Sequence, residues 1–574
     1  MGKPELRGRD VLRSAVRGRR RSVALGVLLG ACHQGGEAIV PVLIGLAIDR
    51  GVVEGDAAGL MMWLGVLAVV YVGLSFSFRY GALAGERASV TAAHLLRVAL
   101  VERVLAPEGG AEDGRLPGEL ANIATEDAKR VGAVTMALIV GAGAAVGLVV
   151  GAVVLLRVSV SLGLLVLLGT PLLLWLGHLL SKPLERRSET EQECAARASG
   201  VAADLVAGLR VLKGIGAEPA ATARYRGISR DSLSATLRAA RAEAWQNGVV
   251  TLLTGAFIAV VALVGGRLAA RGDIGIGELV SCVALALFLI GPLSEFSWVN
   301  AELAQGRASA ARIAAVLGAR PAVSTLPTRM PDAAAQPIAA EGRLRLRDLS
   351  YGPLEAVDID IEAGETVGVV AANPADASAL LHCLGRRTDP ERGAVELDGR
   401  ALTELDLAQA REVILVAEHD ADLFEGTLLD NVAAAAPADG HGSVNPGAAM
   451  TASGTDEVAR SLPDGTGTAV TARGRSLSGG QRQRVALARA LAADAPVLVL
   501  HEPSTAVDAV TEMRMAAGIK ELRRGRTTVL VTNSPALLAV TDRVVLLREG
   551  RVAAAGDHGH LVGTHADYRT AVLA

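Results

Sequence analysis

The stretch that decides the fold is SLSGGQRQR, at Ser476–Arg484. A Ser-Gly-Gly run that opens a helix suits a phosphate group, because unshielded glycine amides and the helix N-terminus both direct positive charge at an anion. A Gly-Gly pair is also common in turns, so this stretch alone leaves a phosphate site and an ordinary turn both open. The sequence on either side decides between them.

The composition divides the chain into a membrane part and a soluble part. At 574 residues the chain is long for one domain, and 51% of the residues are hydrophobic while 20% are charged. The apolar residues are concentrated in the first 300 positions, and the net charge of −3 argues against a nucleic-acid partner. We expect no metal site and no disulfide framework, because no CxxC spacing occurs among Cys32, Cys194, Cys282 and Cys383.

Six apolar stretches are long enough to cross a bilayer, which takes about 20 residues each. They are Ser22–Ile48, Leu60–Ala84, Val131–Leu156, Val158–Leu180, Gly248–Ala270 and Gly277–Asn300. Short connections alternate with two long Arg-rich ones, Gly85–Arg130 and Ser181–Asn247, and long basic connections stay in the cytoplasm. The basic segment Met1–Arg21 carries no cleavable signal. The sequence therefore predicts a multi-pass plasma-membrane protein with both termini in the cytoplasm.

A polar cluster interrupts the first predicted span. His33, Gln34 and Glu37 lie in it, with His33 and Glu37 at i and i+4 on one helical face. Polar groups at this depth are costly, so two interpretations stay open: the cluster lines a translocation cavity, or it contacts a neighbouring helix. Glu295, Asn300 and Glu302, at the end of the sixth span, raise the same question. The spans contain few aromatic residues, so we expect no stacking cage and cannot name a cargo.

The second half of the chain has a different pattern. Between Arg307 and Glu341 the composition shifts to Ala, Arg and Pro, with breaks at Pro321, Pro327, Pro331 and Pro337. From Gly342 onward short strands alternate with helices, as in a P-loop α/β domain. The predicted parts are a basic N-terminus (1–21), a transmembrane domain (22–306), a linker (307–341) and a nucleotide-binding domain (342–574).

With these neighbours, SLSGGQRQR resembles the signature sequence of ATP-binding-cassette (ABC) transporters. The segments Gly114–Val131 and Ala202–Glu218 resemble the intracellular loops of exporter-type members, whose tips carry coupling helices, although amphipathic surface helices of another transporter would give the same pattern. The resemblance implies an all-α transmembrane domain of six helices with long cytoplasmic extensions. It also implies a C-terminal α/β P-loop-type ABC nucleotide-binding domain that uses ATP and Mg²⁺.

The segment that resembles the Walker A motif, Gly364–Gly385, departs from the pattern GxxxxGK(S/T). In a working P-loop the glycine amides wrap the phosphates, the lysine meets their charge and the hydroxyl reaches Mg²⁺. Here Ala371, Pro374 and Asp376 stand where the family has glycines, and Ala377 stands where it has lysine. Only Ser378 is retained. We expect weak triphosphate binding, with Asp376 adding a negative charge beside the phosphates.

Other motifs implied by the resemblance depart in the same direction. His501 stands at the position of the Walker B aspartate, a poor exchange because Mg²⁺ prefers oxygen ligands. Asn533 stands at the switch histidine, and the Q-loop glutamine position falls on Glu418 or His419. The family's other positions are retained. Tyr351 stands at the adenine-stacking aromatic, Glu502 at the catalytic glutamate and Asp508 at the D-loop aspartate. The signature itself is complete, with Ser478, Gly479, Gly480 and Gln481.

This asymmetry predicts a half-transporter that works with a different partner. In ABC proteins each ATP lies between the Walker motifs of one domain and the signature of the other. The predicted partner is a second half-transporter with intact Walker A, Walker B and switch histidine, and the pair would move a small molecule or peptide, in contact with membrane lipid. Export is expected. The alternatives are an exporter-shaped importer of a siderophore or metal chelate, and a non-hydrolysing regulatory subunit. Whether this chain alone is an enzyme stays open.

Overall fold

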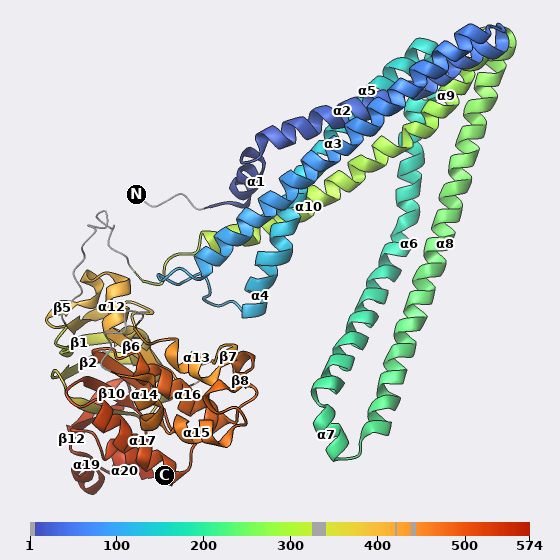
Figure 1. The fold of residues 1–574 in the computed structure, drawn as a ribbon. Helices are drawn as coiled ribbons and strands as arrows, with labels where there is room; N and C mark the ends of the chain where they lie inside the picture. The colour runs from blue at the N-terminus through green and yellow to red at the C-terminus, as the bar shows by residue number, and fades with distance from the viewer. Residues whose placement is uncertain (1–5, 324–339, 420–421, 438–443, 574) are drawn as a thin grey trace. The chain divides into compact units, whose positions relative to one another are not determined.

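The computed structural model describes residues 6–323, 340–419, 422–437 and 444–573, and it divides the chain into two compact units. The first unit contains residues 1–102 and 115–318. The second contains residues 103–114 and 319–574. The first is helical and the second combines helices with sheets (Figure 1).

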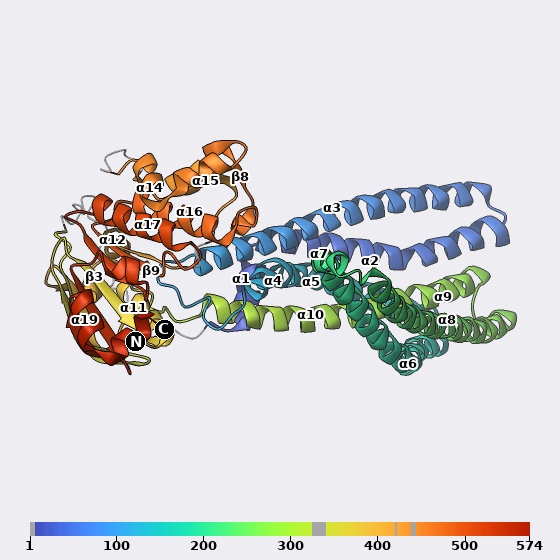
Figure 2. The same ribbon diagram turned by 90° about the horizontal axis from the view of Figure 1, so that it is seen from below.

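Long helices make up the first unit. Their bounds are α1 Gly8–Arg17, α2 Arg20–Ile48, α3 Ala57–Val104, α4 Pro117–Asn122, α5 Ala128–Val158, α6 Val160–Ala207, α7 Leu209–Gly214, α8 Glu218–Arg271, α9 Ile276–Phe288 and α10 Ile290–Leu317. Within the unit α2 packs against α5 and α9, α5 packs against α10, and α6 runs along α8 (Figure 1; Figure 2). The helices form a bundle because their apolar residues repeat along whole stretches rather than on one stripe.

Five helical stretches in the described residues are long and apolar enough to cross a membrane. They are Ala57–Val104, Pro117–Val158, Val160–Lys182, Glu218–Arg271 and Ile276–Leu317, and each overlaps one predicted span. The remaining predicted span, Ser22–Ile48, lies in α2, which is not among the five. The predicted count of six is therefore not confirmed. Helix α2 contains the polar cluster of His33, Gln34 and Glu37.

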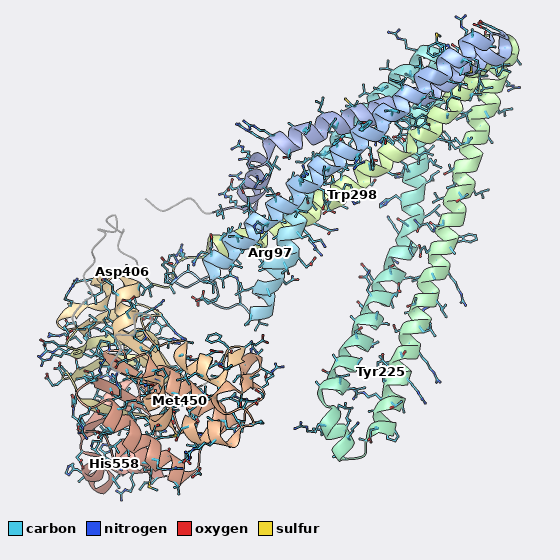
Figure 3. All side chains as sticks on the ribbon, viewed as in Figure 1. Arg97, Tyr225, Trp298, Asp406, Met450 and His558 are labelled. Atoms are coloured by element: carbon cyan, nitrogen blue, oxygen red, sulfur yellow. The ribbon has the colours of Figure 1, made fainter. Side chains whose placement is uncertain are left out.

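Helices α3, α6 and α8 are much longer than a bilayer requires. They contain 48, 48 and 54 residues. At about 1.5 Å per residue each is roughly two and a half times as long as the ~30 Å hydrocarbon core. The excess of α6 and α8 is polar and leads to α7, which lies inside the predicted loop Ala202–Glu218; Tyr225 lies in this part of α8 (Figure 3).

Backbone contact at small residues holds α2 against α9. A Cβ atom on Gly45 would overlap Ser281 Oγ and the Gly277 carbonyl, so only glycine fits there. The close approach is reinforced by two hydrogen bonds: Ser281 Oγ donates to Pro41 O at 3.0 Å, and Gly277 N donates to Asp49 Oδ1 at 2.8 Å. The α2–α9 contact therefore depends on side-chain size at Gly45 and Gly277.

The second unit contains a six-stranded sheet, a four-stranded sheet and a two-stranded pair. Their strand orders are β12-β11-β3-β10-β9-β6, β2-β1-β4-β5 and β7-β8. The strands are β1 Leu344–Tyr351, β2 Leu354–Ile361, β3 Thr366–Ala371, β4 Arg392–Leu397, β5 Arg400–Ala401, β6 Ile414–Ala417, β7 Gly426–Thr427, β8 Ala469–Val470, β9 Val497–His501, β10 Thr527–Val531, β11 Arg543–Arg548 and β12 Arg551–Gly556.

Helices surround these sheets. Their bounds are α11 Pro374–Leu384, α12 Leu407–Val413, α13 Leu428–Ala433, α14 Pro446–Ser453, α15 Thr455–Ser461, α16 Gly479–Ala492, α17 Ala509–Leu522, α18 Pro535–Leu538, α19 His558–Thr564 and α20 Ala566–Leu573. Strands β3, β9 and β10 are parallel and form continuous buried apolar runs, as expected for strands covered on both faces. Their carboxyl ends lie along one edge, where ligands bind in sheets of this kind.

The compact units differ from the predicted domain boundaries in two places. Helix α10 continues to Leu317, past the predicted linker start at Arg307, because its last turns bury Ile313 and Ala314. Residues 103–114 belong to the second unit, where Ala322 N donates to Glu108 O at 3.0 Å. The predicted coupling segment Gly114–Val131 begins where that stretch ends. Linker prolines Pro327, Pro331 and Pro337 lie outside the described residues.

Candidate functional site

The connection between β3 and α11 is too short to form a phosphate cradle. Strand β3 ends at Ala371 and α11 begins at Pro374, so only Ala372 and Asn373 lie between them. Proline at the first helical position favours this early start, and Asn373 Oδ1 caps the helix by accepting from Ala375 N at 3.0 Å. Ala372 N donates to Leu547 O at 3.1 Å, so its amide is also occupied. The strand, turn and helix occur as predicted, but without a wrapping loop.

The residues in the first turns of α11, Asp376, Ala377 and Ser378, present no cation to the turn after β3. Asp376 is 1% exposed, and its Oδ2 accepts a hydrogen bond from Gly550 N at 3.2 Å. Ala377 lies in the hydrophobic core, and Ser378 Oγ donates to Pro374 O at 3.1 Å. The expectation that Asp376 would add negative charge beside the phosphates is therefore wrong. Its carboxylate points into the protein, where it holds the turn between β11 and β12.

Two imidazoles meet at the ends of β9 and β6. The rings of His501 and His419 lie 5.2 Å apart in an edge-to-face arrangement. Burial lowers the pKa of His501, and the nearby His419 lowers it further. Glu418, the other residue considered for the Q-loop position, instead pairs with Arg387 at 2.7 Å. Neutral imidazoles are poor ligands for Mg²⁺, so this pair does not replace an aspartate.

The side chain of Glu502 is occupied by the turn that follows β10. Its Oε2 accepts from Thr532 Oγ1 at 3.1 Å, and its Oε1 accepts from Asn533 N at 3.1 Å. Glu502 also has a left-handed backbone, with φ of 44°. Both carboxylate oxygens thus position the turn that carries Asn533, which gives a structural account of this retained residue.

The signature residues form a complete helix start. Ser478 Oγ accepts from Gln481 N at 3.3 Å, and Gln481 Oε1 accepts from Ser478 N at 2.9 Å, which is a capping box at the start of α16. A Cβ atom on Gly480 would overlap the Ala506 carbonyl, whereas one on Gly479 would meet only Ala506 Cβ at 3.8 Å. The capping bonds and the close approach at Gly480 fix this helix start in place.

A positively charged cavity opens beside this helix start. Its volume is about 520 Å³, and its lining includes Arg473, Arg475, Arg482 and Gly479. Arg473 lies 3.7 Å from Asp422, but within the described part of the chain neither Arg475 nor Arg482 forms an ion pair. Together with the positive end of the α16 dipole, these guanidinium groups suit an anion. By contrast, none of the residues from Ala372 to Ser378, in the turn after β3 and the first turn of α11, is basic.

Gln483 is a functional residue that our sequence analysis did not identify. Its Nε2 donates to Glu502 O at 2.7 Å and to Thr505 Oγ1 at 3.0 Å, and its Oε1 accepts from Ala506 N at 2.9 Å. It therefore ties the signature helix to the segment after β9. The available signal was its helical spacing from Leu487, which puts a polar side chain on the buried face of α16.

The remaining nucleotide-site residues lie elsewhere in the second unit. Tyr351 lines a cavity of about 820 Å³ together with His382, Arg387 and Arg411, away from the turn after β3. Asp508 caps α17 by accepting from Thr511 N at 3.0 Å and Thr511 Oγ1 at 2.8 Å, and these bonds lower its pKa. The structure thus gives Asp508 a capping role.

The polar cluster of α2 contacts a neighbouring helix and also lines cavities in the first unit. Gln34 Nε2 donates to both carboxylate oxygens of Glu295 on α10, at 3.2 Å each, so it contacts a neighbouring helix. His33 and Glu37, with Nε2 and Oε2 3.8 Å apart, also line cavities in the first unit. Asn300 and Glu302 do not line the cavities found in the described residues.

Comparison with known proteins agrees with this architecture. Residues 23–293 match the family model of the ABC transporter transmembrane region, and residues 354–505 match that of the ABC transporter. The chain is 30% identical over 414 residues to an ATP-dependent lipid A-core flippase of Thiobacillus denitrificans, covering 71% of this chain and 70% of that protein. The chain belongs to the ABC transporter family. It combines the transmembrane region and the nucleotide-binding domain of that family in one multi-pass membrane chain.

Further relatives extend over more of this ABC transporter chain. It is 31% identical over 549 residues to a multidrug efflux ATP-binding/permease protein of Mycobacterium bovis, which covers 94% of this chain and 45% of that protein. The chain thus spans about half the length of that relative. A solved bacterial Atm1-family ABC exporter with ATP bound has the same fold, with a TM-score of 0.73, 22% identity and coverage of 97% of this chain and 98% of that chain.

Proposed function

We propose that this chain is the non-catalytic subunit of a heterodimeric ABC exporter. It lends its signature, Ser478–Gln481, to an ATP site whose Walker A, Walker B and switch histidine come from a partner subunit. The observation that carries the proposal is the contrast between the two halves of the nucleotide site within one chain. The Walker half lacks a cradle and a cation, while the signature half is fully built and positively charged.

The Walker half of this chain does not fit ATP with Mg²⁺. Its turn consists of Ala372 and Asn373, with the amide of Ala372 bonded to Leu547. The Mg²⁺ side has imidazole in place of carboxylate, and Glu502 is bonded to Thr532 and Asn533. No step of ATP hydrolysis is assigned to these residues.

The signature half does fit a phosphate group. The α16 helix start is held by the Ser478–Gln481 capping box, and Arg475 and Arg482 add charge beside it. In the closed pair this surface would bind and orient the terminal phosphate of the partner's ATP, and hydrolysis there would drive the alternation of the transmembrane units. The length of the mycobacterial relative, of which this chain spans about half, supports the need for a second half.

The transmembrane arrangement follows from the same proposal. We infer that α2 also crosses the membrane, which brings the number of spans to six. Both termini and the α6–α7–α8 and α3–α4 turns are then cytoplasmic. Export of a small molecule or peptide across the plasma membrane is supported by the activities for which the relatives are named, multidrug efflux and lipid A-core flipping. Transport assays in inverted and right-side-out vesicles test the direction.

The test of the lent signature is the ATPase rate of the purified pair. Ser478→Ala in this chain removes the side-chain half of the cap and should lower the rate about tenfold, because the surface that meets the partner's ATP loses its fixed geometry. Ser461→Ala is the matched control, since Ser461 Oγ donates only to Val458 O at 2.7 Å on α15. An unchanged rate for Ser478→Ala in a folded pair would remove the basis of the proposal.

A further inference from the structure

Two cavities of the first unit meet at His33, Glu37 and Phe78. Their volumes are about 480 and 380 Å³, a range that accommodates small organic molecules. The first cavity is lined from α2, α3 and α9, and the second from α2, α3, α5 and α10. They therefore flank one cluster of side chains among α2, α3, α5, α9 and α10.

The cluster holds two carboxylates and no permanent positive charge. Glu37 and Glu295 line the cavities, and in the described part of the chain no lysine or arginine lines them or pairs with either carboxylate; the only basic group beside them is the His33 imidazole, 3.8 Å from Glu37. Gln34 satisfies the hydrogen bonding of Glu295 but brings no charge. Gln34 Oε1 is itself buried without a hydrogen-bond partner. Carboxylates at membrane depth are costly without a counter-charge, so a positively charged ligand would lower the free energy of this cluster.

Aromatic residues line the cavity beside Glu37. Tyr71, Phe78 and Phe288 line the first cavity, Phe78 also lines the second one beside Glu295, and the rings of Phe78 and His33 lie 5.2 Å apart. The spans contain few aromatic residues, but α3 and α9 bring these three to one cavity. An aromatic face attracts a cation within about 6 Å and also offers apolar contact. Negative charge and aromatic faces together select for a ligand that is both positive and apolar.

We propose that this cluster, formed by His33, Glu37, Glu295 and Phe78, binds an apolar organic cation, such as a bulky quaternary ammonium or phosphonium ion. As a cargo site it rests on the proposed transport function. Glu37 and Glu295 supply the counter-charge, and Phe78 and Tyr71 contact the hydrophobic substituents. An anionic amphiphile, such as a phosphorylated lipid, would face two carboxylates without a cation and is rejected by the same charges.

The test uses two ions of the same shape and opposite charge. Equilibrium dialysis of the full chain in detergent, without nucleotide, measures binding of tetraphenylphosphonium and of tetraphenylborate. We expect the phosphonium to bind at least tenfold more tightly. Glu37→Gln and Glu295→Gln should each weaken it about tenfold by removing one charge, and Phe78→Leu should weaken it severalfold. Glu86→Gln, an exposed carboxylate on α3 outside both cavities, is the control and should change nothing.

Three results would overturn the proposal: equal binding of the two ions, tighter binding of the borate, or an undiminished phosphonium affinity in both Glu variants. If Glu295→Gln fails to fold because its bond to Gln34 is weakened, Glu37→Gln and Phe78→Leu carry the test, since neither changes that contact. The measurement requires neither the partner nor ATP hydrolysis. A failure of the lent-signature proposal therefore leaves this result unaffected, and the reverse also holds.

Discussion

At the residue scale, Asp376 holds the Walker-like helix to the turn between β11 and β12. Replacing it with alanine leaves Gly550 N without its buried acceptor and should destabilise the second unit by about 1–3 kcal/mol. Asp376→Asn keeps an acceptor oxygen and should cost less. Urea unfolding of the full chain, followed by the fluorescence of a reporter attached to the second unit, measures both. Equal stability of wild type and Asp376→Ala would contradict this assignment.

The role of Glu502 can be separated from that of a catalytic base. Glu502→Gln keeps an oxygen that can accept from Asn533 N, so the pair's ATPase rate should stay within about twofold of wild type. In a hydrolytic site the same change would remove the group that activates water and cost orders of magnitude. A large loss of ATPase activity in Glu502→Gln would show that this chain's own site hydrolyses ATP.

His501 should make the second unit sensitive to acid. Burial lowers its pKa, so the unfolded chain binds a proton more readily than the folded one. The stability that the folded state has with His501 neutral is fully present above the unfolded pKa of about 6.5. It is lost as the pH falls below that value toward the pKa of His501 in the folded chain. His501→Asn should therefore flatten the fall in melting temperature between about pH 7.5 and about pH 5.5. An unchanged pH slope in the variant would count against a buried neutral imidazole.

At the element scale, the α2–α9 contact depends on two glycines. Gly45→Ala would put a Cβ atom into Ser281 Oγ and the Gly277 carbonyl, and overpacking of this kind costs about 1–3 kcal/mol. Gly65→Ala on α3 is the control, because nothing lies within 4 Å of the added Cβ atom and alanine favours a helix. The melting temperature of the chain in detergent should fall for Gly45→Ala and stay unchanged for Gly65→Ala. If both variants lost the same amount of stability, the loss would come from the backbone effect of replacing glycine and not from overpacking at the α2–α9 contact.

Local patterns were enough to predict most elements. The long apolar runs predicted five of the helical spans, and the alternation of short strands with helices from Gly342 predicted the α/β domain. The early start of α11 could also have been predicted, because Pro374 favours the first turn of a helix. The end of α10 could not, since it depends on burial of Ile313 against other helices rather than on the composition of the segment.

At the scale of the whole molecule, the contacts that escaped prediction join residues far apart in the sequence. Asp376 and Gly550 are 174 positions apart, and Gln34 and Glu295 are 261 apart. Motif resemblance identified which side chains were replaced, but not that Asp376 points inward or that Glu502 is bonded to the turn after β10. The gathering of Tyr71, Phe78 and Phe288 around Glu37 likewise follows from helix packing and not from composition.

The most direct measurement of the central claim is the number of nucleotides trapped during turnover. Vanadate arrests a hydrolysing ABC site with ADP bound, so the purified pair can be incubated with ATP and vanadate, freed of excess nucleotide and assayed for ADP. The lent-signature proposal predicts one trapped ADP per pair, which accumulates about tenfold more slowly when Ser478→Ala is introduced in this chain. Two trapped ADP per pair, or one that accumulates at an unchanged rate with Ser478→Ala, would contradict it.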